Sequence, residues 1–218
     1  YGQLPPPLRD KLDGLIHLFL DDKTFEPCGG LEEVTFEMRI TIAAQACILI
    51  LGQECKKLPY PGLRSILVYP DAYTVREEGQ STSVRLGESW NRGTVVLAWK
   101  SVLHGGVRAN DGDNVTFHEF AHQLDSQDHA TDGAPPLNDA LAYRAWSAAF
   151  SRAWEKFTKR LSAGEPALMS ACGATNHAEF FAVMVENFFE RPRELSSKHP
   201  EAYAQLCAYF RLDPLTWL

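Results

Sequence analysis

The stretch VTFHEFAHQLD, Val115–Asp125, places two histidines four residues apart, with a glutamate directly after the first. At 100° per residue its apolar side chains form one stripe of a helix, and His118 and His122 share another face. Residues i and i+4 are neighbours on a helix, so both imidazoles can reach one metal ion. Glu119 lies at the edge of that face, where its carboxylate can accept a proton from water at the metal. The stretch predicts a zinc-binding helix; a helix with a solvated polar face is the alternative.

A catalytic zinc site needs a third protein ligand and an open position for water. One alternative places this ligand just behind the helix, in the pattern HExxHxxGxxH, which would use Asp128 here. That pattern requires a turn-forming glycine where this chain has Asp125. The other alternative takes a glutamate from a later helix, and we favour it.

Glu179 is the favoured third ligand. It lies in the apolar run AEFFAVMV, residues 178–185, where an unpaired buried carboxylate would be strongly unfavourable. Two alternatives remain open. With Asn176 as the N-cap, Glu179 could instead cap the start of its own helix. Glu186, two turns further along, is either the ligand itself or a partner of one.

The apolar periodicity predicts a single α+β domain over residues 1–218, mostly helical, with a small mixed sheet before the zinc helix. We divide it into an N-terminal helical part of about residues 1–60 and a catalytic part of about residues 61–218. Strands are expected over 65–75, 82–90 and 93–103. Helices are expected over about 8–20, 35–51, 113–124, 137–162, 176–190 and 200–210.

Composition narrows the class of protein. The 218 residues carry a formal net charge of −7 and no basic cluster that we recognised, which argues against direct nucleic-acid binding. The longest apolar run, residues 40–51, is too short to span a membrane, and YGQLPPPLRD at the start lacks the features of a secretory signal. The five cysteines lack CxxC spacing and are interpreted as reduced thiols. We therefore expect a cytoplasmic protein.

Several segments together resemble one known family. They are VVLAW (95–99), HEFAHQLD (118–125), GAPPL (133–137), GATNHAEFFAV (173–183) and PEAYAQLCAYFRLDP (200–214). The chain resembles the Mlc titration factor A (MtfA) family of zinc metallopeptidases over nearly its whole length. The catalytic part of that family is similar to the zinc domain of anthrax lethal factor, which implies a zincin-like α+β fold.

The resemblance implies specific roles. His118, His122 and Glu179 would bind Zn²⁺, and Glu119 would be the general base. The implied activity is an aminopeptidase-like hydrolysis of peptide substrates in a bacterial cytosol. The family takes its name from binding a glucose-responsive transcriptional repressor, which makes such a repressor a candidate partner.

One position departs from the family. The resemblance implies a tyrosine seven residues before the ligand glutamate, where it would support the developing oxyanion, and this chain has Cys172. A thiol is a weaker donor. Losing such a donor can cost about 2.7–4 kcal/mol of transition-state stabilisation, unless Tyr143 or another group replaces it. The candidates for contacts around the metal or with substrate are thus Cys172, Glu186, Asp125 and Trp99.

The strand Thr94–Trp99 precedes the zinc helix in the sequence. As an edge strand it would pair with an extended peptide, and an interior strand that fills the core is the alternative. Two further hypotheses compete with the peptidase. One is a binding protein that sequesters a regulator and keeps a structural or vestigial zinc site. The other is a zinc hydrolase of some other amide or ester.

Overall fold

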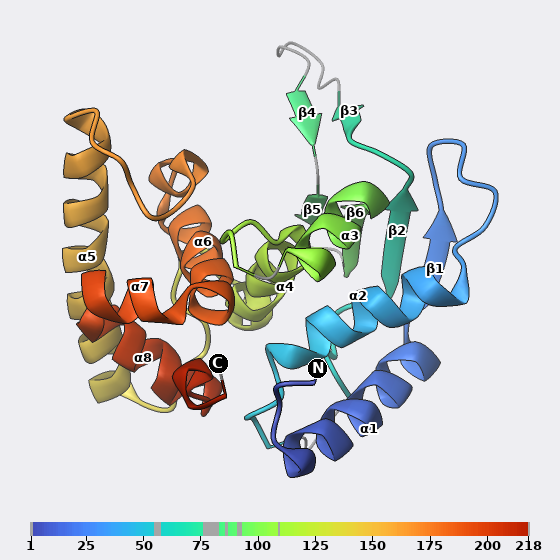
Figure 1. The fold of residues 1–218 in the computed structure, drawn as a ribbon, viewed down its shortest axis with the longest axis horizontal. Helices are drawn as coiled ribbons and strands as arrows, with labels where there is room; N and C mark the ends of the chain where they lie inside the picture. The colour runs from blue at the N-terminus through green and yellow to red at the C-terminus, as the bar shows by residue number, and fades with distance from the viewer. Residues whose placement is uncertain are drawn as a thin grey trace.

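The sheet is mixed, as the sequence predicts (Figure 1). The computed structural model describes residues 2–54, 58–75, 83–85, 87–90, 93–108 and 110–217. The strand order is β1-β2-β6-β5, formed by β1 (Thr24–Pro27), β2 (Ser65–Tyr69), β6 (Thr94–Ala98) and β5 (Gly87–Trp90). The first three strands run parallel and β5 is antiparallel to β6. A separate antiparallel pair joins β3 (Tyr73–Val75) and β4 (Ser83–Arg85).

Three helices accompany the sheet in the first half of the chain. They are α1 (Pro6–Asp22), α2 (Phe36–Ile48) and α3 (Trp99–Val107). Parallel strands need a crossover connection, and α2 lies in the one between β1 and β2. Helix α1 packs along α2, and α2 in turn contacts α3 and the predicted zinc helix.

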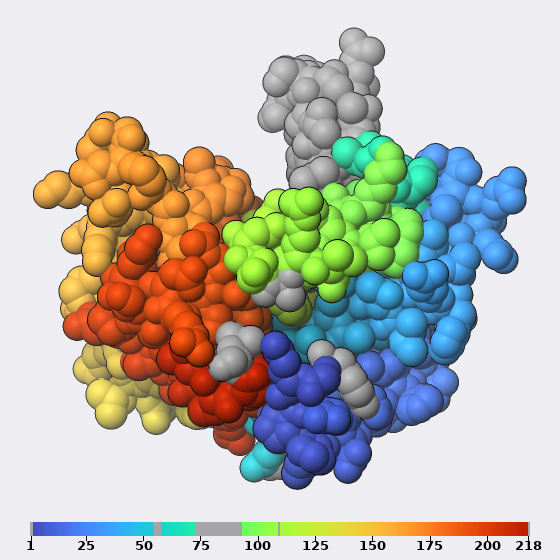
Figure 2. Space-filling model, in the orientation of Figure 1, coloured from blue at the N-terminus to red at the C-terminus, as the bar shows by residue number. Residues whose placement is uncertain are grey.

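The C-terminal half is helical, with α4 (Val115–Asp125), α5 (Ala140–Ser162), α6 (His177–Glu190), α7 (Pro192–Lys198) and α8 (Pro200–Phe210). Helix α4 packs against α6 on one side and against β5, β6 and α2 on the other. It therefore lies at the centre of the fold, between the sheet and the C-terminal helices (Figure 1). In the space-filling view the N-terminal segments and the C-terminal helices lie on opposite sides of the segment that contains α3 (Figure 2).

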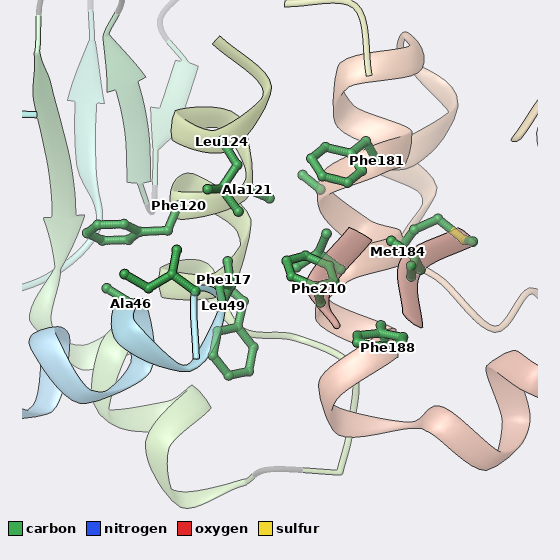
Figure 3. Packing of buried hydrophobic residues seen from close by; sticks show 14 of the residues in the cluster. Ala46, Leu49, Phe117, Phe120, Ala121, Leu124, Phe181, Met184, Phe188 and Phe210 are labelled. Carbon is green, nitrogen blue, oxygen red and sulfur yellow. The ribbon is translucent and has the colours of Figure 1, made fainter. Parts of the chain in front are cut away.

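The buried face of α4 is the stripe that the periodicity predicts. Phe117, Phe120, Ala121 and Leu124 are all buried. Phe120 points toward Ala46 of α2, whereas residues of α6 and α8 pack on the opposite side of the core (Figure 3). Because Phe120 is fully buried, its truncation to alanine would cost about 3–5 kcal/mol. This packing fixes the rotation of α4 about its axis, and thereby the direction of its histidines.

Some predictions about local structure are wrong. The strand expected over residues 93–103 ends at Ala98, and α3 begins at Trp99. The continuous apolar run there fits a strand or a helix equally well, so periodicity could not find the boundary. Strand β1 and helix α7 were not predicted. Most β1 side chains are exposed and show no alternating apolar pattern, and α7 has only seven residues.

Of the two alternatives for the strand Thr94–Trp99, the structure supports the interior one, because β6 is not at an edge of the sheet. It pairs with β2 on one side and with β5 on the other, so its backbone is not free to accept a peptide. The pairing of β1 with β2 means that both predicted parts of the chain contribute to one sheet. Among the described residues, none of the helices combines the length and apolar character needed to cross a membrane.

Candidate metal centre

Capping fixes where α4 begins. The side-chain oxygen of Asn114 accepts a hydrogen bond from the backbone N–H of Phe117 at 3.0 Å, so Asn114 is the N-cap. With the helix beginning here, its apolar stripe faces the core. His118 and His122 then fall on the side of the helix that faces α6.

Helix α6 begins in the same way. Asn176 is its N-cap and accepts a hydrogen bond from the backbone N–H of Glu179 at 2.9 Å. Glu179 therefore occupies the N3 position, as the capping alternative requires. Its carboxylate, however, contacts the two imidazoles of α4.

Three donor groups meet between α4 and α6. The Nε2 atom of His118 lies 3.1 Å from one carboxylate oxygen of Glu179, and the Nε2 atom of His122 lies 3.3 Å from the other. One ligand atom from each residue falls within 4.8 Å of those of the other two. Tetrahedral zinc with bonds of about 2.0–2.2 Å separates its ligand atoms by about 3.3–3.6 Å. The three residues therefore fit a divalent metal ion with little movement.

The charges at this site favour a cation. Burial disfavours the charged form of His118, but hydrogen bonds to Glu179 and Glu186 outweigh it and raise the pKa of the imidazole well above its usual 6.5. Hydrogen bonds from His118 and His122 lower the pKa of Glu179 well below its usual range. Glu179 is thus ionised, and the site attracts positive charge, which a proton or a metal ion can supply.

Glu186 orients His118 from behind. One of its oxygens lies 2.8 Å from Nδ1 of His118, and the other accepts the backbone N–H of Asn114 at 2.7 Å. A carboxylate on the far nitrogen fixes the imidazole tautomer that leaves Nε2 free for a metal. Glu190, one turn further along α6, accepts hydrogen bonds from the side chain of Asn114 and the backbone of Gly112. Two carboxylates of α6 thus hold the start of α4.

Comparison with known proteins identifies the family. A family model described as glucose-regulated metallo-peptidase M90 matches residues 1–211. The chain belongs to this family. An uncharacterized protein of Synechocystis sp. is 43% identical over 224 residues, which cover 99% of this chain and 80% of that protein. Proteins named Mlc titration factor A from Yersinia pestis and Yersinia pseudotuberculosis are 30% identical over 226 residues, 99% of this chain and 82% of theirs. The resemblance to the MtfA family is confirmed.

In this M90 chain a second link ties the end of α4 to the start of α6. Both carboxylate oxygens of Asp125 accept the backbone N–H of Gly133, at 3.1 and 2.9 Å. Gly133 has a positive φ of 82°, and a Cβ added there would lie 2.3 Å from the carbonyl oxygen of His177. His177 is the first residue of α6, two positions before Glu179. The fully buried Asp125 therefore holds a loop that abuts the helix carrying the third donor.

The other predicted site residues lie as follows. Glu119 is buried beside the pair of histidines, and its charge acts on His118. Cys172 is exposed in the short helix η2 (Ala171–Ala174), which packs on α6. Trp99 is partly buried and packs on the core. The hydroxyl of Tyr143 accepts the backbone N–H of Leu137 at 3.2 Å.

Asp128 accepts the backbone N–H of Ala130 and is not among the grouped metal donors of the described residues, so the ligand just behind the helix finds no support. Sequence reasoning missed Glu190. Its spacing of four residues from Glu186 in an otherwise apolar helix was the available signal, because a second buried carboxylate also needs partners.

Proposed function

We propose that this chain is a zinc-dependent peptidase whose metal is held by His118, His122 and Glu179. The observation that supports this best is the convergence of three donors, with no fourth in the group found among the described residues. Structural zinc sites are usually closed by four protein ligands, whereas catalytic sites keep one position open. The Glu179 side chain is 29% exposed, so the centre is accessible from solvent.

The chain's own residues would divide the chemistry between them. Zinc, when bound, supplies a Lewis acid that acidifies water and polarises a scissile carbonyl. The carboxylate of Glu119 accepts the proton of the attacking water and delivers it to the leaving amine nitrogen. Glu186 holds the proton on Nδ1 of His118 and so keeps Nε2 directed at the metal.

Substrate contacts are the next part of the proposal. We assign peptides as substrates and an aminopeptidase-like preference, on the strength of the family resemblance. Cys172 would lie near the substrate, in the place where the family has a tyrosine. Tyr143 is a second candidate donor, although its hydroxyl already accepts a hydrogen bond from Leu137. The remaining O–H of Tyr143 can still donate.

The test compares Glu119→Gln with the wild-type chain loaded with zinc. Zinc content is measured by elemental analysis, and hydrolysis is measured on peptides with free and with blocked N-termini. We expect wild-type cleavage that a chelator removes and zinc restores, and that requires a free N-terminus. The variant should keep one zinc ion per chain and lose about 10²–10⁴-fold in turnover. Glu155→Gln, an exposed position on α5, is the matched control. Retained turnover in Glu119→Gln would rule out the assigned base.

A second function is supported by the name of the relatives, Mlc titration factor A. We propose that the chain also binds a transcriptional repressor of the Mlc type in the cytoplasm. Among the described cysteines, Cys28, Cys172 and Cys207 are free thiols, which fits a reducing compartment. Co-elution of the purified chain with such a repressor should persist in Glu119→Gln, because binding does not need the base. Peptide cleavage without a stable repressor complex would support only the peptidase function. A stable complex without cleavage would favour the sequestering role.

A further inference from the structure

Two adjoining cavities lie among α5, α7 and α8, and their lining includes none of the residues placed in the metal centre. Their volumes are about 80 and 180 Å³. Both are lined by Lys156, Lys198 and His199. A site needs about 10–15 Å³ of such volume to hold one water molecule. The larger cavity, which is open to solvent, can therefore hold a small polyatomic ligand.

Positive charge gathers at these cavities in a chain whose net charge is −7. Two arginines at the rim have carboxylate partners: Arg160 pairs with Glu165 at 3.2 Å, and Arg152 pairs with Glu201 at 2.6 Å. The two lysines differ, because neither Lys156 nor Lys198 pairs with a carboxylate in the described part of the chain.

Lys156 has one hydrogen bond, to the backbone oxygen of Lys198 at 2.7 Å. This bond gives the backbone carbonyl at the end of α7 a hydrogen-bond donor, which by itself explains a structural role for Lys156. It leaves two of the three ammonium hydrogens of Lys156 without an assigned acceptor. Two exposed lysine charges thus lie at the cavity without a carboxylate partner among the described residues.

His199 supplies the independent observation. It is only 8% exposed and lines both cavities, yet its ring makes no hydrogen bond to any described residue. Burial, and then the charges of Lys156, Lys198 and Arg160, lower the pKa of this imidazole to about 4. The ring nitrogens are not among the fully buried, unpartnered atoms of the described residues, so they reach the open space of the cavities, where water or a ligand can satisfy them.

The start of α8 adds backbone donors. His199 is the N-cap residue but gives no side-chain cap, and Pro200 occupies the first turn. Across the described residues, the backbone N–H groups of Glu201 and Ala202 have no acceptor, and both residues line the larger cavity. Uncapped amides at a helix N-terminus favour an anion.

We propose that this cavity binds a phosphate group, held by Lys156, Lys198, the ring of His199 and the first amides of α8. A phosphate dianion balances two lysine charges, whereas a carboxylate supplies only one charge and fewer acceptor oxygens. Inorganic phosphate and a small phosphate monoester offer the same group, and the cavity is large enough for either.

The experiment titrates the full chain with inorganic phosphate, glycerol 3-phosphate, acetate and uncharged glycerol, at a slightly alkaline pH where phosphate is a dianion. Binding is followed by calorimetry and by the imidazole NMR signals of His199. We expect saturable phosphate binding with a Kd of about 1 mM or lower, and a shift of the His199 signals. At about ten times the Kd, Tm should rise by about 3–6 °C. A larger response to glycerol 3-phosphate than to phosphate would indicate a monoester as the ligand.

Variants locate the site. Lys156→Gln and Lys198→Gln should each weaken phosphate binding by about fivefold or more, because each removes a charge-assisted contact. Lys159→Gln removes the same charge from α5 at a position that does not line either cavity, and should bind as wild type. Circular dichroism checks that each variant folds. Absence of saturable binding, equal weakening in Lys159→Gln, or binding of an acidic peptide but not of phosphate would overturn the proposal.

Discussion

Replacing Glu186 by glutamine tests whether this carboxylate orients the imidazole of His118 toward the metal. The two oxygens of Glu186 accept from two donors, Nδ1 of His118 at 2.8 Å and the backbone N–H of Asn114 at 2.7 Å. Glutamine has the same shape but only one acceptor oxygen. Its NH₂ group must therefore face one of these donors, and one hydrogen bond is lost.

The size of the effect follows from this loss. A hydrogen bond to a charged group contributes about 1.5–3 kcal/mol. Removal of the carboxylate behind a metal-binding histidine typically weakens metal affinity by about 10–100-fold, which is consistent with that range. In Glu186→Gln the free energy of unfolding should change less than the free energy of zinc binding, because two effects on folding oppose each other. Burial raises the pKa of Glu186, so loss of its buried charge partly offsets the lost hydrogen bond.

The assay is a competition titration of zinc against a chromogenic chelator, combined with urea unfolding of the metal-free chain. Glu155→Gln is again the matched control, since Glu155 is exposed on α5. We expect Glu186→Gln to bind zinc about 10–100-fold more weakly than the wild type and the control. An affinity within about twofold of the wild type would refute the role of Glu186 in orienting His118.

Three further predictions follow from other contacts. Gly133→Ala should lower zinc affinity by about tenfold, because its Cβ would meet the carbonyl of His177. Gly164 has a similar positive φ but no neighbour within 4 Å, so Gly164→Ala should only lose about 1 kcal/mol of stability. Equal zinc affinities in the two variants would argue against the loop contact. Burial raises the pKa of Glu190 from 4.5 to about 7, so the native state keeps a proton that the unfolded state loses between these pH values. The free energy of unfolding of the wild type should therefore fall relative to Glu190→Gln by about 3 kcal/mol as pH rises through that interval. Urea unfolding with chelator present measures this difference, and a difference independent of pH would contradict the shift. Phe120→Ala should lower the free energy of unfolding by about 3–5 kcal/mol, and a loss under about 1 kcal/mol would show that this ring does not fix α4.

The sequence predicted α4 well because several signals agree there. The apolar stripe and the spacing of the histidines require the same helix, and the structure adds an Asn114 cap at its start. Glu179 was also accessible to sequence reasoning, since a carboxylate in an apolar run needs a partner. Both predictions rest on residues that lie within one helix and are therefore close together in the sequence.

Other features depend on contacts between distant segments. The interior place of β6 follows from pairing with β5 and β2, which no local pattern encodes. The link from Asp125 through Gly133 to His177 requires a loop to return to α6, and the cavity at Lys156 and Lys198 joins residues that are 42 positions apart. Such features are set by tertiary packing and become visible only in the folded chain.

X-ray absorption spectroscopy of the zinc-loaded chain tests the proposed metal site most directly. We predict a shell of nitrogen and oxygen atoms at about 2.0–2.2 Å, with the outer-shell signal of two imidazoles. The Glu179→Ala variant should bind zinc more weakly with both imidazoles kept. A sulfur neighbour at about 2.3 Å, or a spectrum and affinity unchanged in Glu179→Ala, would contradict a centre built from His118, His122 and Glu179.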